Sequence, residues 1–200
     1  DVPMMTFIGD QVTDEDSDTT IVLSASDVDI AENGQSLYWS VSSTNESLVN
    51  VSILDPNTDG TEASLNFDVL DDQNGQALIS VTVTDSVGGT ANEIFTLYVN
   101  TVNDAPELSP IANQDTNEDS IITVSLFASD VDIATNGQTL SYSAISNDSA
   151  LVVLGTTESN SEGTEGILYL VVQPNQNGIA EIMVTVTDDV SDNLTDSTTF

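Results

Sequence analysis

The chain has no basic side chain: its 200 residues contain no Lys, Arg or His, against 34 Asp and Glu. A compact fold with a net charge of −34 repels itself, and no internal salt bridge is available to offset the repulsion. The counter-charge must come from solution, either as screening salt or as bound divalent cations, for which carboxylate and amide oxygens are suitable ligands. Evenly spread acids favour the first source, and acids clustered at recurring positions favour the second.

Composition excludes several classes of function. Hydrophobic residues make up 38% of the chain and recur in alternating runs, which a disordered acidic tail lacks. Without Cys or His, thiol chemistry and the usual zinc sites are excluded. Only a paired-carboxylate mechanism remains for catalysis, and no carboxylate is marked as an acid in a substrate cleft, so we predict that the chain is not an enzyme. Nucleic acid and anionic membranes would repel this surface, and no run is apolar enough to insert in a membrane.

The chain is an internal duplication with a shift of 103 residues. Asp27-Val-Asp-Ile-Ala-Glu-Asn-Gly-Gln35 recurs as Asp130-Val-Asp-Ile-Ala-Thr-Asn-Gly-Gln138. The doublet Glu15-Asp16 recurs as Glu118-Asp119 with the same shift. We therefore predict two domains, residues 1–102 and 103–200. Phe200 corresponds to Phe95, so the last strand of the second repeat is expected to be truncated, with further repeats following.

The apolar residues of each repeat alternate with period 2, which is typical of half-buried β-strands. Seven short strands separated by turn signals, without helical periodicity, predict an all-β fold of two tandem seven-stranded Greek-key β-sandwiches of the cadherin or immunoglobulin type. Trp39 is expected to fill the core of the first sandwich. The strands of the first repeat are predicted near residues 4–9, 19–26, 36–43, 48–54, 63–69, 77–84 and 92–101.

The recurring acids fall in loops and at strand ends rather than on solvent-facing strand positions. An Asp-x-Asp loop follows the second strand of each repeat (Asp27 and Asp29; Asp130 and Asp132), where two carboxylates can point at one cation. The alternative is that these are turn residues that hydrogen-bond to nearby backbone N–H groups. Without a cation, however, carboxylates a few Å apart raise each other's pKa, and no basic side chain can relieve them. Scattered acids such as Glu158, Glu162 and Asp192 are interpreted as solvated surface.

The segment Val102-Asn-Asp-Ala-Pro106, the Asp-x-Asp loop that follows it and the Thr-Asp that ends the sixth strand resemble the bacterial cadherin-like tandem repeats of giant adhesins and surface proteins. The resemblance covers the whole chain and implies sandwiches in an end-to-end array with Ca²⁺ between successive repeats. The second repeat departs from the first at one point, because Val171, Pro174 and Asn175 stand where the first has Asp68, Asp71 and Asp72.

Carried over residue by residue, the resemblance implies three groups of metal ligands. One group serves the junction of the two repeats, and the other two are half-junctions at either end. The central group is Glu15, one of Asp68, Asp71 and Asp72, then Asn103, Asp104, Asp130, Asp132, Asp188 and Asn136; the N-terminal group is Asp1, Asp27, Asp29, Asn33 and Asp85; the C-terminal group is Glu118 with Asp119.

The leading hypothesis for function is a calcium-rigidified structural extender of a long secreted bacterial adhesin or cell-surface filament. Its expected partners are neighbouring repeats of the same chain, other copies in a fibre, or a ligand on a cell surface or in the matrix. The alternative is a carbohydrate- or protein-binding sandwich module, for which Tyr38 and Tyr98 are the candidate exposed rings. Halophilic adaptation is a further alternative, but it predicts acids spread over exposed strand positions.

Overall fold

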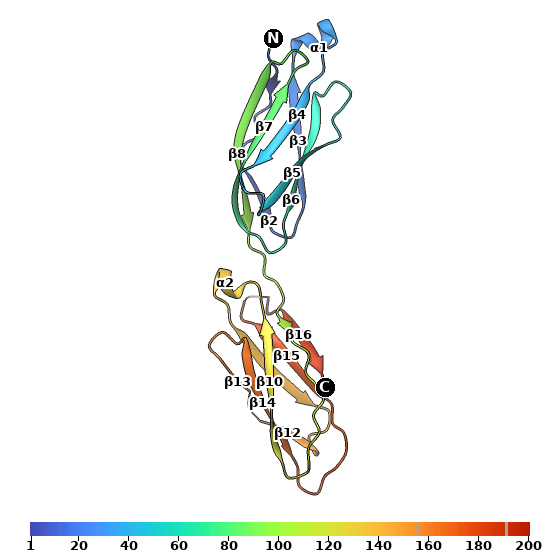
Figure 1. The fold of residues 1–200 in the computed structure, drawn as a ribbon, viewed down its shortest axis with the longest axis vertical. Helices are drawn as coiled ribbons and strands as arrows, with labels where there is room; N and C mark the ends of the chain where they lie inside the picture. Colours follow the sequence, from blue (N-terminus) through green and yellow to red (C-terminus); the bar gives the residue numbers. More distant parts are fainter. Residues whose placement is uncertain (156, 191) are drawn as a thin grey trace. The chain divides into compact units, whose positions relative to one another are not determined.

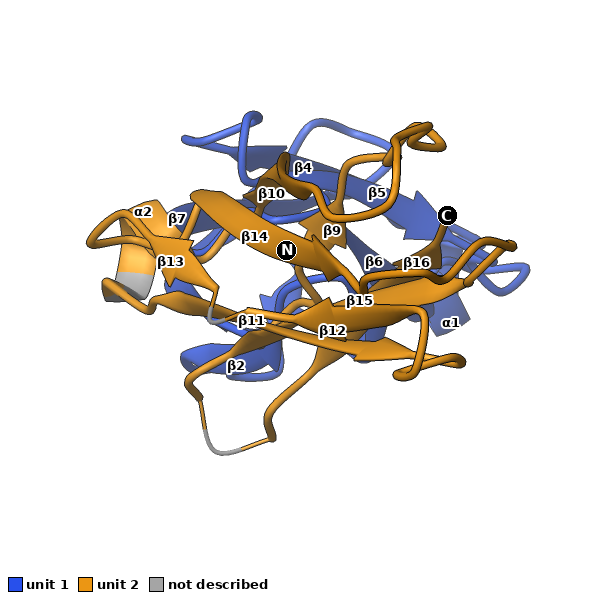
Figure 2. Ribbon diagram, turned by 90° about the horizontal axis from the view of Figure 1, so that it is seen from below, with its two compact units in different colours: residues 1–102 blue, residues 103–200 orange. Residues whose placement is uncertain are grey.

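The computed structural model describes residues 1–155, 157–190 and 192–200, and not the side chain of Asn136. The chain forms two compact units, Asp1–Val102 and Asn103–Phe200 (Figure 2). Both units are β-sandwiches, as the alternating apolar pattern predicts (Figure 1). No helix of the described residues is both long and apolar enough to cross a membrane.

Unit 1 consists of two four-stranded sheets that enclose one core. Along each strand, buried residues alternate with exposed ones, and the buried set includes Leu65, Phe67, Ile79 and Leu97. The rings of Phe67 and Phe95 meet edge to face, with centroids 6.3 Å apart. One sheet has the order β1 (Met4–Met5), β3 (Thr19–Ser26), β6 (Glu62–Val69) and β5 (Val49–Leu54), and the other has the order β2 (Gln11–Asp14), β8 (Thr90–Asn100), β7 (Gly75–Thr84) and β4 (Tyr38–Ser43).

Of the segment predicted as the first strand, residues 4–9, only Met4–Met5 form a strand, and a second strand that was not predicted, β2, follows at Gln11–Asp14. β1 pairs antiparallel with β3, whereas β2 pairs parallel with β8 in the opposite sheet. The chain crosses between the sheets at Gly9, whose φ of 73° lies in the left-handed region that glycine adopts without strain. Glu93 fixes this crossing, because its Oε1 accepts the N–H groups of Ile8 (2.9 Å) and Gly9 (3.2 Å).

Unit 2 repeats the architecture around a core that includes Leu126, Leu168 and Val184, all fully buried. Its β16 ends one residue before Phe200, and the segment 114–117, which corresponds to β2, forms no strand. One sheet contains β9 (Glu107–Leu108), β10 (Ile121–Ser129), β14 (Glu165–Val172), β12 (Val152–Leu154) and β13 (Glu158–Ser159), and the other contains β11 (Leu140–Ser146), β15 (Ile182–Asp188) and β16 (Thr195–Thr199).

Each Asp-x-Asp loop contains a short helix that the sequence pattern did not predict: α1 (Val28–Asn33) and α2 (Ile133–Asn136). Asp27 caps α1, since its Oδ1 accepts the N–H of Asp29 over 2.8 Å. Gly34 ends that helix in the left-handed conformation, with φ 67°. Helices of one or two turns are too short to show an apolar period, and the all-β prediction for the two units holds beside them.

Trp39 of β4 packs against the core of unit 1, as predicted. Its indole Nε1 donates a hydrogen bond to the carbonyl of Gly60 over 2.7 Å. Gly60 is required there, because a Cβ at this position would lie 2.0 Å from the carbonyl oxygen of Leu37. The corresponding residue of unit 2 is Tyr142, whose hydroxyl is buried with no hydrogen-bond partner in the described part of the chain.

Candidate metal centre

Three segments of unit 2 bring four aspartates and one asparagine together. Asn103 Nδ2 donates to Asp188 Oδ2 over 2.8 Å, and the backbone N–H of Asp104 donates to Asp132 Oδ2 over 2.8 Å. The N–H of Asp132 in turn donates to Asp130 Oδ1 over 2.9 Å. The segment before β9, the loop after β10 and the end of β15 therefore form one acidic cluster, as expected from the repeat pattern.

The carboxylates of this cluster are withdrawn from water without a basic partner. Asp132 is 3% exposed and Asp188 is 2% exposed. Burial raises the pKa of Asp130, the negative charges of Asp132 and Asp188 raise it further, and hydrogen bonds from the backbone of Asp132 and the side chain of Gln138 act in the opposite direction. A buried carboxylate is stable in ionised form only if a counter-charge is supplied, and this chain can supply none from its side chains.

The ligand atoms fit a hard divalent cation. Asn103 Oδ1 is buried and has no hydrogen-bond donor among the described residues, so an amide oxygen is available beside the carboxylates. Carboxylate and amide oxygens without nitrogen or sulfur ligands are the set that Ca²⁺ prefers. Asn136, the remaining residue expected in this group, has a side chain that lies outside the described residues.

The corresponding end of unit 1 has a related arrangement. Asp85 is buried, and its Oδ1 accepts the N–H groups of Val87 (2.8 Å) and Gly89 (2.7 Å). Its Oδ2 and the Oδ2 of Asp27 are buried with no hydrogen-bond partner in the described ranges. Asn33 Nδ2 donates a hydrogen bond to Asp29 Oδ1 over 2.9 Å, and this bond orients the carboxylate of Asp29.

One expectation is wrong at this end. The α-amino group of Asp1 forms an ion pair with Asp29 Oδ2, so an internal salt bridge does exist although the chain has no basic side chain. The hydrogen bond to Asp29 and the negative charge of that carboxylate raise the pKa of the amino group.

The opposite end of unit 1 contains Glu15, Asp16 and Asp72. The sequence indicates Asp72 only as one of three alternative ligands and does not indicate Asp16 as a ligand. Glu15 is 2% exposed and accepts the N–H of Val102 (2.8 Å) and the amide of Asn74 (3.3 Å). Asp16 Oδ1 accepts the N–H of Asp72 over 3.0 Å, whereas Asp71 is exposed beside it. Asp16 and Asp72 have φ angles of 60° and 57°, which few residues other than Gly and Asn adopt. In the sequence, the only indication that Asp16 and Asp72 lie together was that each belongs to an acidic doublet, Glu15-Asp16 or Asp71-Asp72.

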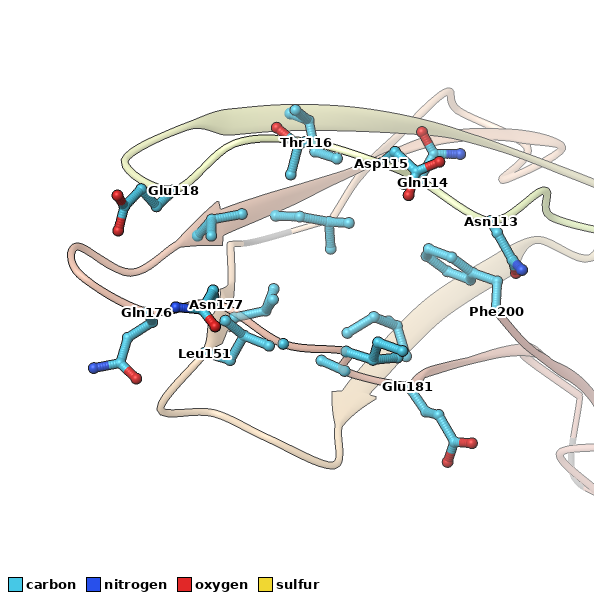
Figure 3. Close-up of a pocket in the computed structure, with 18 of the residues that line it drawn as sticks. Asn113, Gln114, Asp115, Thr116, Glu118, Leu151, Gln176, Asn177, Glu181 and Phe200 are labelled. Carbon is cyan, nitrogen blue, oxygen red and sulfur yellow. The ribbon is translucent and has the colours of Figure 1, made fainter.

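Glu118, the counterpart of Glu15, is exposed in unit 2. It lies on the rim of a groove of about 890 Å³ whose walls include Leu151, Leu170 and Ile182, with Phe200 on another side (Figure 3). In unit 1 the same positions, Leu48, Phe67 and Ile79, belong to a core that β8 completes with Leu97 and Val99. Glu15, by contrast, is buried in unit 1 and accepts the N–H of Val102.

Comparison with known proteins identifies the fold but not a family. No protein-family model and no curated protein matches the chain. Among solved structures, the extracellular cadherin domains 1–4 of protocadherin gamma B7 align with 100% of this chain and 48% of that one, at 18% identity and a TM-score of 0.55. Extracellular cadherin domains 1–5 of protocadherin gamma B2 align with 99% of this chain and 38% of that one, at 16% identity and a TM-score of 0.52. The chain thus spans half or less of these structures, and its two units have the cadherin-like β-sandwich fold.

Proposed function

We propose that this chain is a pair of extender repeats of a long secreted bacterial adhesin or surface filament, stiffened by Ca²⁺ at the acidic ends of its repeats. The observation that carries the proposal is the cluster of Asp104, Asp130, Asp132 and Asp188 with Asn103, which is partly buried and has no cationic side chain. The cadherin-like fold and the resemblance of the Asn-Asp-Ala-Pro segment to bacterial tandem repeats support the same conclusion. We propose no catalytic activity.

The ligands we propose fall into the groups expected from the sequence. In unit 2 they include the buried Oδ1 of Asn103, and in unit 1 they include the unpartnered oxygens of Asp27 and Asp85. The bound cation would supply the positive charge that the side chains lack. The proposed ligands are Asn103, Asp104, Asp130, Asp132, Asp188 and Asn136; Asp1, Asp27, Asp29, Asn33 and Asp85; Glu15 with Asp68, Asp71 or Asp72; and Glu118 with Asp119. To the expected ligands we add Asp16, whose Oδ1 accepts the N–H of Asp72.

The mechanical role follows from how Asn103 and Asp104 are held. These residues begin unit 2, and each is hydrogen-bonded to a carboxylate of a different loop, Asp188 or Asp132. When the carboxylates are ionised and uncompensated, their mutual repulsion opposes these hydrogen bonds. When they are neutralised, the hydrogen bonds fix the first residues of the unit to its β-sheets. We propose that this fixes the connection between successive repeats.

The setting in which this would operate is outside the cell. Extracellular calcium modules bind with dissociation constants of about 10⁻⁴–10⁻³ M. Such sites would be filled in calcium-rich surroundings and empty in cytoplasm, so that the gain in stability, about RT ln(1 + [L]/Kd) per site, would follow export. The proposed partners are neighbouring repeats of the chain, other copies in a fibre, and ligands on a cell surface or in the matrix.

Calcium titration of the 200-residue chain tests the proposal. At constant ionic strength, we expect a rise in melting temperature between micromolar and millimolar Ca²⁺, together with a larger maximum dimension in small-angle scattering. The double variant Asp130→Asn/Asp132→Asn should lose both responses of unit 2, whereas the exposed control Glu162→Gln/Asp192→Asn, which removes the same number of charges, should keep them. If sodium at equal ionic strength had the same effect as calcium, the acids would be a diffuse halophilic surface and the proposal would be wrong.

A further inference from the structure

One outward sheet face of unit 2 is apolar, although the chain is otherwise rich in acids. It lies on β10, β14 and β12, on the side away from the core (Figure 1). Ile121 is 68% exposed and Phe127 is 52% exposed, and the remaining members are exposed or half-buried. We define the apolar face as Ile121, Phe127, Val153, Ile167, Tyr169 and Val171.

The strand register makes these side chains a continuous patch. Val171 of β14 lies opposite Ile121 of β10 on one side and opposite Val153 of β12 on the other, which forms a row across three strands. Tyr169 and Ile167 are the next two outward positions of β14, opposite Thr123 and Ser125. Directly paired side chains on one face lie about 5 Å apart, close enough to touch.

Unit 1 provides an internal reference for what the fold requires at these positions. The same row contains Asn50 and Asp68, and Asn50 Nδ2 donates to Asp68 Oδ2 over 3.2 Å. Among the described strand residues of this face in unit 1, the exposed apolar side chains are Met4, opposite Ser26, and Val22 and Leu54, which flank Ser64. The counterparts of the six apolar residues, at the shift of 103, are all polar: Asp18, Ser24, Asn50, Ser64, Asn66 and Asp68.

Polar residues at all six positions of unit 1 mean that the sandwich itself does not need an apolar surface there. Burial in the core does not explain the substitutions either, because the outward positions of β10 and β14 alternate with the core residues Val124, Leu126, Leu168 and Leu170. The largest contiguous apolar patch on a soluble protein covers some hundreds of Å² and is often functional. These six positions of unit 2 therefore have the features of a docking surface, and the same six positions of unit 1 do not.

We propose that the apolar face of unit 2 binds the same face of a second copy of this chain. Two chains of net charge −34 repel each other wherever carboxylates meet, and they can approach most closely where carboxylates are few. Among the described residues of this face, the acids are at its margin: Glu165, opposite Phe127, and Glu158, which accepts a hydrogen bond from the Tyr169 hydroxyl at 3.5 Å. In unit 1, by contrast, Asp18 and Asp68 would place like charges in the centre of such a contact.

The size of the face sets the expected strength of the contact. Its six side chains present roughly 400 Å², typical of the largest apolar patch on a monomer. A standard interface uses about 800 Å² per partner, so one pair of faces gives a weak and transient association. The face uses none of the proposed calcium ligands, and the association is therefore expected both with calcium and with a chelator.

Sedimentation equilibrium of the whole chain between micromolar and millimolar concentration tests this inference. In EDTA, the wild type should show a monomer–dimer equilibrium that strengthens at least several-fold between 0.05 and 0.5 M NaCl, because salt screens the repulsion between the two chains. The variant Ile121→Asp/Val153→Asn/Val171→Asp carries the residues that unit 1 has at these positions, so it is compatible with the fold and should remain monomeric. Circular dichroism and the melting profile establish that this variant is folded.

A control and a reciprocal variant identify the surface. Val22→Asp/Leu54→Asn makes similar changes on the corresponding face of unit 1 and should leave dimerisation unaltered. The reciprocal variant Asp18→Ile/Asn50→Val/Asp68→Val should add a second contact surface and produce species larger than dimers. A wild-type chain that stays monomeric at every concentration and both salt levels, or dimerisation that persists in the triple variant, would overturn the proposal. Because the assay in EDTA needs no bound calcium, its result is separate from that of the calcium titration.

Discussion

Asn103 and Asp188 are 85 residues apart in sequence, yet the amide nitrogen of one donates to Oδ2 of the other over 2.8 Å. The bond attaches the first residue of unit 2 to the end of β15. A carboxylate at residue 103 would face the carboxylate of Asp188, whereas the amide of Asn103 donates a hydrogen bond to it. The side chain at residue 103 therefore affects the net negative charge of the acidic cluster of unit 2.

Asn103→Asp should destabilise unit 2 when calcium is chelated. The substitution replaces the donor to Asp188 with a second acceptor of like charge, which leaves a buried carboxylate without its hydrogen bond at a cost of about 1–3 kcal/mol. Calcium should reduce the loss, since the added carboxylate is also a ligand. Urea unfolding in EDTA and in millimolar Ca²⁺ measures both effects. Asn147→Asp is the matched control, because Asn147 donates to Glu181 at 3.2 Å on the exposed surface; an equal loss in the two variants would contradict the prediction.

Gly89→Ala should destabilise unit 1 through Asp85. A Cβ at residue 89 would lie 2.4 Å from Asp85 Oδ2, so either the carboxylate or the turn has to move. We expect a loss of about 1–3 kcal/mol in the unfolding of unit 1, as is usual when a well-packed site is overfilled. The same substitution made in an Asp85→Ala background should cost much less. If Gly89→Ala cost the same in both backgrounds, its effect would not pass through this contact.

Trp39→Phe and Tyr142→Phe, at corresponding positions of the two units, should change stability in opposite directions. Trp39→Phe removes the donor to the Gly60 carbonyl and leaves a gap, and should cost about 1–3 kcal/mol. Tyr142→Phe removes a buried hydroxyl that has no partner in the described part of the chain, and should be neutral or stabilise by up to about 1 kcal/mol. Thermal unfolding of the two single variants measures both changes, and a clear loss in Tyr142→Phe would show that the hydroxyl is in fact hydrogen-bonded.

Asp189 should make the stability of unit 2 depend on pH in the acid range. The backbone N–H of Thr139 (2.7 Å) and its hydroxyl (2.9 Å) donate to this carboxylate and hold its pKa below the usual 3.8. The folded state thus binds a proton less readily than the unfolded state, so the stabilisation is complete above pH 3.8 and is lost as the pH falls through the folded-state pKa. The wild type should be more stable than Asp189→Asn near neutral pH, and the two should converge in acid. A difference that stayed constant with pH would point to packing rather than ionisation.

The period-2 pattern was sufficient to predict the strands, because each strand buries one face. The strand predicted at residues 19–26 is β3, and those predicted near 63–69 and 77–84 are β6 and β7 with their ends moved by one or two residues. The pattern did not predict that residues 4–9 contain only the short strand β1 or that β2 follows it, since this depends on which strands of the folded unit pair with them. The helix α1 is too short for a periodic signal, although its Asp27 cap and terminal Gly34 are recognisable in retrospect.

The candidate site was predictable to the extent that it depends on local sequence. The spacing of Asp130 and Asp132 and their repetition in both units indicated a cluster, and the structure brings them together with Asp104 and Asp188. The orientation of side chains was not predictable, because it depends on distant partners. Asp72 contacts Asp16 through a backbone N–H across 56 residues, and Glu15 accepts the N–H of Val102 across 87 residues.

The parallel pairing of β2 with β8 affects how unit 1 would respond to a pulling force. Residues Gln11–Asp14 run beside Leu97–Asn100 in the same direction, near the two ends of the unit. Tension applied through the chain would pull these strands past each other along their length, so that their hydrogen bonds are loaded together. Bonds loaded together have to break at nearly the same moment, whereas bonds loaded from one end open one at a time. The crossing at Gly9 thus gives a sandwich without disulfides a mechanical clamp between its second strand, β2, and its last strand, β8.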